Sequence, residues 1–152
     1  MDVGHLPLNA RAGAASLTRR VTFAAAHRYR RPEWDDATNE AVFGLCARPE
    51  YHGHTYVCDV TVSGPVEAAT GMIVDLRLLD AALQREVLAR FDHRNLNTDV
   101  DDFADGRLIP TGENLARLIA ERVQAALGTA ATVSSVTVAE DATLSATWGV
   151  TA

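Results

Sequence analysis

The chain has 152 residues, of which 47% are hydrophobic and 22% charged, and its formal net charge is -6. This length and composition fit one soluble globular domain and exclude wholesale disorder, a collagen-like repeat and a disulfide-rich scaffold. The acidic balance argues against broad electrostatic binding to nucleic acid or to an anionic membrane. Every basic residue is an arginine, so a lysine nucleophile, a lysine Schiff base and a P-loop lysine are excluded.

The cysteines and the N-terminal sequence bear on location and domain organisation. No apolar run approaches the roughly 20 residues that span a bilayer, and the first residues lack the apolar stretch of a signal peptide. Cys46 and Cys58 are too few for a disulfide framework, so we expect a cytoplasmic protein with reduced thiols. Residues 1–18 are expected to form a loosely held N-terminal arm, followed by one domain over 19–152.

Alternating apolar residues predict four strands. Two of them cover 20–27 and 52–63 in the first half of the chain, and two more cover 136–140 and 144–150 near its C-terminus. The long connection 28–51 separates the first two strands. Loops of this length in compact domains often carry function.

The apolar spacing changes to three and four residues between these pairs of strands, which predicts two amphipathic helices. The first covers 76–91 with Asp75 as its N-cap, and the second carries an apolar stripe over 115–127 between Thr111 and Gly128. The order of elements, ββααββ, predicts an α+β fold with two helices on one face of a four-stranded antiparallel sheet. Such a sheet leaves open edges, which favours self-association.

Three histidines form the candidate metal site. His52 and His54 are two residues apart on a predicted strand, so both imidazoles leave the same face. His27 ends the other predicted strand, and pairing of the two strands would bring all three together. Three histidine ligands with an open fourth position are typical of catalytic zinc. The alternative, that these are unrelated surface histidines, is about equally favoured by the spacing alone.

Other polar residues offer a base and an anchor, each with a structural alternative. Cys46 lies in a loop before the histidine pair, where a nearby cation would favour the thiolate, although most free cysteines are simply buried. Asp92 and His93 could transfer protons to or from such a thiol, or His93 could only complement a helix dipole. Glu140 continues a buried strand face, where it either accepts paired N–H donors from a planar ligand or reaches solvent.

Seen together, these residues resemble the 6-pyruvoyltetrahydropterin synthase / 6-carboxytetrahydropterin synthase family. The similarity runs in the family's order from about Arg19 to the C-terminus, and jointly the motifs are highly specific. They are FAAAHR at 23–28, FGLC at 43–46, HGH at 52–54, GMIVDL at 71–76, DHRNLN at 92–97 and PTGENL at 110–115, followed by Glu140.

The resemblance implies a T-fold whose sheets join into trimeric barrels, stacked as homohexamers with active sites between subunits. It implies a zinc-dependent lyase that converts 7,8-dihydroneopterin triphosphate to 6-pyruvoyl-tetrahydropterin with loss of triphosphate, in a tetrahydrobiopterin-type pathway. The implied roles are zinc ligands for His27, His52 and His54, a general base for Cys46 assisted by Asp92 and His93, and substrate binding for Glu140, Thr111 and Glu113.

Two other functions stay open. A sister branch of the family makes 6-carboxy-5,6,7,8-tetrahydropterin for deazaguanine (queuosine) biosynthesis from the same substrate. The five residues between Cys46 and His52, and the segment 95–114, look more like the pyruvoyl branch. The second alternative is a zinc- and pterin-binding protein without turnover, against which the presence of Cys46, Asp92 and His93 argues, because binding alone needs no base.

Overall fold

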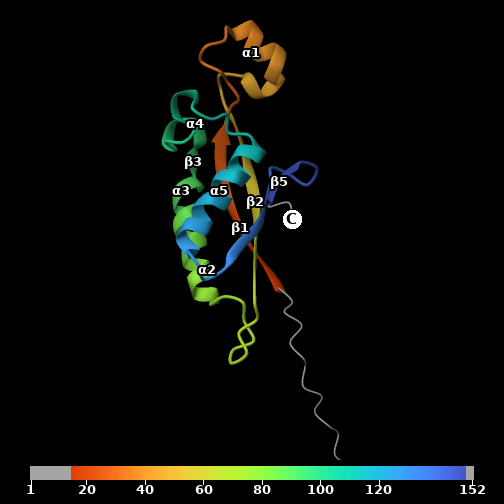
Figure 1. The fold of residues 1–152 in the computed structure, drawn as a ribbon. Coiled ribbons are helices and arrows are strands. Elements are labelled where there is room, and N and C mark those ends of the chain that lie inside the picture. Colours follow the sequence, from red (N-terminus) through yellow and green to blue (C-terminus); the bar gives the residue numbers. More distant parts are fainter. Residues whose placement is uncertain (1–14, 150–152) are drawn as a thin grey trace, which may run out of the picture.

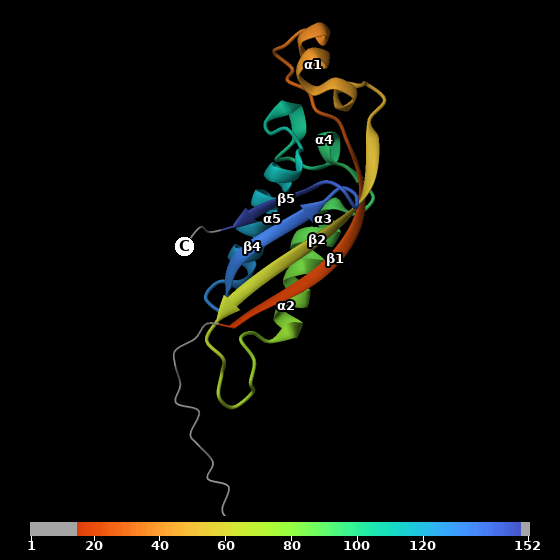
Figure 2. The same ribbon diagram turned by 90° about the vertical axis from the view of Figure 1, so that its right-hand side faces the viewer.

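The computed structural model of this chain describes residues 15–149 (Figure 1). One layer is a twisted sheet with the strand order β3-β1-β2-β4-β5, and the two longest helical segments form the second layer (Figure 2). The strands are Ala15–His27 (β1), His52–Gly64 (β2), Arg94–Asn95 (β3), Thr132–Ala139 (β4) and Ser145–Gly149 (β5).

The sheet corrects the expected strand count. β1, β2, β4 and β5 pair antiparallel, as the alternation predicts, but β3 adds a fifth strand that runs parallel to β1 beside Ala25 and Ala26. The sheet is therefore mixed and five-stranded. β3 has two residues and so carries no alternation that a sequence pattern can detect.

The first strand also begins earlier than expected. β1 starts at Ala15, so the last residues of the expected arm 1–18 belong to the sheet. Its N-terminal half lacks a clean alternation because Arg19 takes a position on the otherwise apolar face between Leu17 and Val21. Residues 1–14 of that arm, and Val150 of the expected last strand, lie outside the described residues.

Both predicted helices form, with the predicted caps. The Asp75 side chain accepts a hydrogen bond from the backbone N–H of Arg77 at the start of α2 (Leu76–Leu83). A π-helical turn, Gln84–Leu88, links α2 to α3 (Ala89–Phe91), so the predicted helix over 76–91 is continuous but not α-helical throughout. The second helix, α5 (Gly112–Leu127), begins at the Thr111 cap and ends at Gly128, whose φ is 57°.

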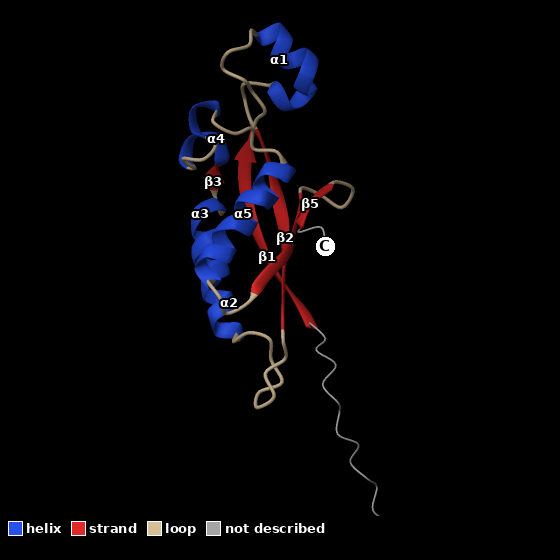
Figure 3. Ribbon diagram, in the orientation of Figure 1, coloured by secondary structure: helices blue, strands red, loops and turns tan. Residues whose placement is uncertain are grey.

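The two long connections contain short helices that the sequence pattern does not predict (Figure 3). α1 (Asp36–Phe43) and a 3₁₀ turn, Gly44–Ala47, lie beyond the end of the sheet, and α4 (Leu96–Asp99) follows β3. The buried amide of Asn39 fixes the chain that leads into α1. It accepts from the backbone N–H of Arg31 and donates to the carbonyl oxygens of Arg31, Trp34 and Asp35.

The core lies between the sheet and the helices of the second layer. Phe23 of β1 stacks on Tyr56 of β2 with ring centroids 5.0 Å apart, and Phe91 packs against Phe23 from the helical layer at 5.7 Å. The opposite face of the sheet is polar, with an Arg20–Asp59 ion pair among threonines. Within residues 15–149, every helix is too short or too polar to cross a membrane.

Candidate metal centre and active site

Strand register brings the three histidines together. β1 and β2 pair so that His27 lies directly opposite His52, and His54 lies opposite Ala25 on the same face. The Nε2 atoms of His27 and His52 are 3.0 Å apart, and one ligand nitrogen from each of the three rings lies within 4.8 Å of the others. The grouping that the two-residue spacing suggested is therefore present.

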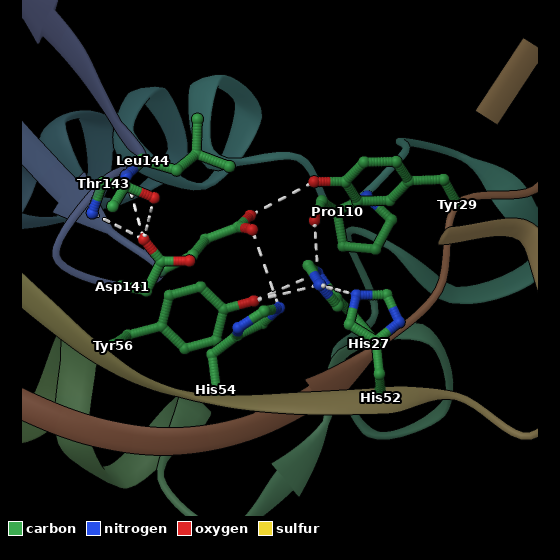
Figure 4. A network of polar contacts seen from close by, with 10 residues as sticks. His27, Tyr29, His52, His54, Tyr56, Pro110, Asp141, Thr143 and Leu144 are labelled. Carbon is green, nitrogen blue, oxygen red and sulfur yellow. Dashed lines mark hydrogen bonds and ion pairs between the residues drawn. The ribbon is translucent and has the colours of Figure 1, made fainter. Parts of the chain in front are cut away.

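The hydrogen-bond partners of the His27 ring determine which of its two nitrogens faces His52 and His54 (Figure 4). Its Nδ1 lies 2.8 Å from the carbonyl oxygen of Pro110, which can only accept, so Nδ1 carries the proton. The Tyr56 hydroxyl lies 3.0 Å from the same nitrogen. The Nε2 lone pair of His27 thus points toward His52 and His54, in the arrangement by which an outer hydrogen bond orients a metal-bound imidazole.

The donor set fits a zinc ion. The Nε2 atom of His54 is buried and has no hydrogen-bond partner among the described residues, which is unusual for a polar atom unless a ligand satisfies it. Burial, together with the neighbouring imidazoles of His52 and His54, lowers the pKa of His27 to about 4, although the hydrogen bond to Pro110 acts in the opposite direction. Burial and His54 also lower the pKa of His52. Neutral imidazoles are the form that binds a metal, and zinc prefers nitrogen ligands about 2.0–2.1 Å away.

Glu140 extends the candidate site on its β4 side. Its carboxylate is 9% exposed, with Oε2 3.6 Å from Nε2 of His54 and Oε1 accepting a 3.2 Å hydrogen bond from the Tyr29 hydroxyl. Asp141 caps the following turn by accepting from the backbone N–H groups of Thr143 and Leu144 (Figure 4). Glu140 is therefore a buried carboxylate on a fixed turn, and the alternative that it reaches solvent is wrong.

Cys46 lies in the 3₁₀ turn that follows α1 and is half-buried. Its carbonyl oxygen accepts a 2.7 Å hydrogen bond from the backbone N–H of Tyr29. Burial raises the pKa of the Cys46 thiol, and the Glu140 carboxylate raises it further. The residues of this chain alone therefore favour the neutral thiol, and formation of a thiolate needs a cation or a proton acceptor close by.

Asp92 and His93 lie elsewhere. They follow α3 at the outer edge of β1, where Asp92 accepts from the backbone N–H of Ala24 and pairs with Nδ1 of His93 at 3.0 Å. His93 is 84% exposed at its side chain and borders a shallow hollow over Ala24, Ala26 and Gly53 on the polar side of the sheet. The backbone of His93 bonds to Ala24 within β1, whereas that of Cys46 bonds to Tyr29 beyond the end of this strand, and the described residues show no contact between the pair and Cys46.

Thr111 and Glu113 occupy the first turn of α5. The Thr111 hydroxyl is used as the helix cap, where it accepts from the backbone N–H of Asn114, and Glu113 is exposed. The preceding residue, Pro110, holds His27, so this turn borders the histidine group. Gly112 lies close to Glu140, because a Cβ there would be 3.9 Å from its Oε1 atom.

Comparison with known proteins identifies the family. The sequence model for 6-pyruvoyl tetrahydropterin synthase matches residues 16–149. The chain belongs to this family. Curated relatives of the chain carry the names of enzymes, and the 6-pyruvoyl tetrahydrobiopterin synthase of Drosophila melanogaster is 42% identical to it over 110 residues. That match covers 72% of this chain and 64% of the fly protein, so the chain spans somewhat less than two thirds of that relative.

The chain is also similar to a solved structure and to a relative with a different name. The 6-pyruvoyl tetrahydropterin synthase of Caenorhabditis elegans superposes with a TM-score of 0.85 at 31% identity, covering 93% of this chain and 99% of that chain. A Bacillus subtilis protein named 6-carboxy-5,6,7,8-tetrahydropterin synthase is 37% identical over 87 residues, which is 57% of this chain and 56% of that protein. Both branches of the family therefore contain relatives.

Tyr29 and Tyr56 also belong to the site, although the sequence alone does not identify them as candidates. Tyr56 continues the face of His52 and His54 by one more two-residue step, and Tyr29 continues that of His27. Burial raises the pKa of both hydroxyls, with the Glu140 carboxylate as the next cause, so both hydroxyls keep their protons. The two-residue period of β2 predicts that Tyr56 lies on the same face as the histidines. Tyr29 lies beyond the end of β1, so the strand period does not predict the direction of its side chain.

Proposed function

We propose that this chain is a zinc-dependent lyase that converts 7,8-dihydroneopterin triphosphate to 6-pyruvoyl-tetrahydropterin with loss of triphosphate. The observation that carries the proposal is the group of three imidazoles, with a buried carboxylate and a loop thiol beside it. The names of the fly and nematode relatives support the pyruvoyl reaction in particular. We place the protein in the cytoplasm, which suits its two free cysteines.

His27, His52 and His54 would hold the zinc ion, with the fourth position left for substrate. Bound there, zinc would supply Lewis acidity toward the side-chain hydroxyls of the substrate. Glu140 would bind the pterin ring by accepting its adjacent N–H groups, because a buried carboxylate makes strong charge-assisted hydrogen bonds. The turn at Thr111 and Glu113 would line the same pocket.

Cys46 would act as the general base that moves protons on the substrate side chain. Its thiol needs help to ionise, because burial and Glu140 both raise its pKa. Asp92 and His93 would provide that help, with the carboxylate orienting the imidazole through their 3.0 Å contact. Since they lie away from Cys46 in one chain, we propose that they come from a neighbouring subunit.

We therefore propose a homohexamer built as a dimer of trimers, each trimer closing its sheets into a barrel. Two edges of the sheet support this assembly. The outer edge of β1 pairs with β3 only at Ala25 and Ala26, and β5 is the other terminal strand of the described sheet. Such edges accept strands from further copies, and a closed ring satisfies them all. Trp148 on β5 is 46% exposed, and burial at such a contact would stabilise the assembly.

Product identification tests the proposed reaction. The zinc-loaded protein is incubated with 7,8-dihydroneopterin triphosphate, and products are identified by mass spectrometry while triphosphate release is measured. We expect a 6-pyruvoyl product in step with triphosphate. A 6-carboxy product would instead favour the alternative function supported by the Bacillus subtilis relative. Binding without any triphosphate release would leave only a zinc- and pterin-binding protein.

A further inference from the structure

Tyr29 contacts Glu140, His27 and Cys46, although it has none of the proposed catalytic or zinc-binding roles itself. We propose that Tyr29 is a positioning residue, whose hydroxyl holds the Glu140 carboxylate in the orientation that binds the pterin ring. This inference rests on the proposed function, and in particular on the proposed role of Glu140. It adds a determinant of substrate affinity that lies on the loop after β1.

The hydroxyl of Tyr29 donates to Oε1 of Glu140 at 3.2 Å. Within residues 15–149, this is the single hydrogen bond that the carboxylate of Glu140 accepts, since Nε2 of His54 lies 3.6 Å from Oε2. A glutamate side chain has three rotatable bonds, and holding one oxygen limits the orientations of both. Each carboxylate oxygen accepts two hydrogen bonds, so the hydroxyl leaves capacity for the N–H groups of a ligand.

Tyr29 is itself held from several sides, which makes it a fixed support. Its ring meets the edge of His27 with centroids 5.1 Å apart and the ring of Phe43 at 5.9 Å. Phe43 stacks in turn on Trp34. The backbone N–H of Tyr29 donates to the carbonyl oxygen of Cys46 at 2.7 Å. The hydroxyl thus places Glu140 relative to the histidine group and the loop thiol at once.

One substitution tests the role of the Tyr29 hydroxyl separately from the roles of its ring and backbone. Tyr29→Phe removes the hydroxyl and keeps both the ring packing and the backbone bond to Cys46. We expect the Kd for 7,8-dihydroneopterin, a pterin without triphosphate, to rise roughly 5- to 10-fold in calorimetry. The KM for the triphosphate substrate should rise by a similar factor, while kcat changes less than about twofold and zinc content stays the same.

Two further variants show whether Tyr29 acts through Glu140. In a double-mutant cycle, Tyr29→Phe combined with Glu140→Gln should bind the pterin no more weakly than Glu140→Gln alone. Phe43→Leu alters the packing around the Tyr29 ring and leaves the hydroxyl in place. We expect the pterin affinity of this control to stay within about twofold of the wild type, because the contact with His27, the backbone bond to Cys46 and the bond to Glu140 still hold Tyr29. A loss as large as that in Tyr29→Phe would assign the effect to ring packing and overturn the role of the hydroxyl.

The outcomes separate the inference from the proposed function. If Glu140→Gln weakens pterin binding and Tyr29→Phe does not, the inference is overturned while the proposed function stands. If the effects of the two substitutions add, Tyr29 acts independently of Glu140 and the inference is again overturned. If the wild-type protein binds no pterin, the proposed function fails first and the inference fails with it.

Discussion

The backbone N–H of Tyr29 donates a hydrogen bond to the carbonyl oxygen of Cys46, with 2.7 Å between nitrogen and oxygen. Tyr29 lies two residues after His27, the last residue of β1, whereas Cys46 belongs to the 3₁₀ turn after α1. The thiol is therefore placed by a main-chain bond that does not involve its own side chain. Removal of the sulfur leaves this bond intact, so the consequences for chemistry and for folding can be measured separately.

We predict that Cys46→Ala lowers kcat by at least 100-fold while zinc content and thermal stability stay near wild type, because the proposed base is lost and the main-chain bond is kept. Triphosphate release under saturating substrate, metal analysis and thermal unfolding provide the readouts. Cys58→Ala is the matched control, since Cys58 is fully buried in the core and should affect stability more than turnover. Wild-type rates in Cys46→Ala would remove Cys46 from the mechanism.

The histidine group predicts one zinc ion per chain. Replacing both His52 and His54 with alanine leaves a single ligand, so we expect zinc content in elemental analysis to fall below about a tenth of the wild-type value. His93→Ala serves as the control, because His93 lies outside the group and is exposed. Full zinc occupancy in the double variant would show that the metal binds elsewhere.

The sequence predicts the strands and helices that are long enough to show a hydrophobic periodicity. Alternation locates β2, β4 and β5 and most of β1, and the helical spacing locates α2 and α5 with their caps. α1, α4 and β3 escape prediction because each is short and lies in a polar connection. There, side chains such as Asn39 fix the backbone through local hydrogen bonds, which no apolar periodicity encodes.

The same distinction applies to the candidate site. His52 and His54 are predictable because the strand period fixes the direction of their side chains, and pairing with β1 adds His27. The directions of Cys46 and His93 depend on loop conformation. His93 has a φ of 57°, an unusual backbone conformation that the residue sequence alone does not reveal. Hence the sequence indicates which groups are present, and the structure is needed to show that the pair at 92–93 lies apart.

Gly106 supports the loop that precedes α1, and its substitution should be costly. It has a φ of 71°, and a Cβ at this position would overlap the rigid ring of Pro32. We expect Gly106→Ala to lower the free energy of unfolding by roughly 2 to 4 kcal/mol in urea denaturation. Gly71→Ala is the control, because Gly71 has a φ of 69° with nothing within 4 Å of the added Cβ. Equal losses in both variants would show that contact with Pro32 contributes nothing.

Glu86 predicts a pH-dependent contribution to stability. Hydrogen bonds from Arg85 and Arg90 lower the pKa of this carboxyl, with that from Arg85 the largest cause. Its contribution is therefore fully present above the unfolded value of about 4.3 and is lost as pH falls through the lower folded pKa. Glu86→Gln should cost on the order of 1 kcal/mol at pH 7, and this difference should vanish in acid.

Urea denaturation from pH 7 down to about 3.5 checks this behaviour. The exposed glutamate of the Arg117–Glu121 pair, 3.9 Å from its partner, provides the control, and Glu121→Gln should change stability by less than about 0.5 kcal/mol throughout. A loss in Glu86→Gln that is the same at every pH would mean that packing of the side chain, and not its charge, stabilises the π-helical turn.

The separation of Cys46 from the Asp92–His93 pair predicts complementation between inactive chains. Cys46→Ala and His93→Ala chains, each inactive alone, are unfolded together and refolded with zinc. If a site takes Cys46 from one chain and His93 from another, random mixing in equal amounts rebuilds about a quarter of the sites. Cys46→Ala mixed with His54→Ala is the control. These two residues belong to the same half of the site, so no mixed assembly regains both. Equal recovery in the two mixtures, or a fully active monomer in light scattering, would contradict a site shared between subunits.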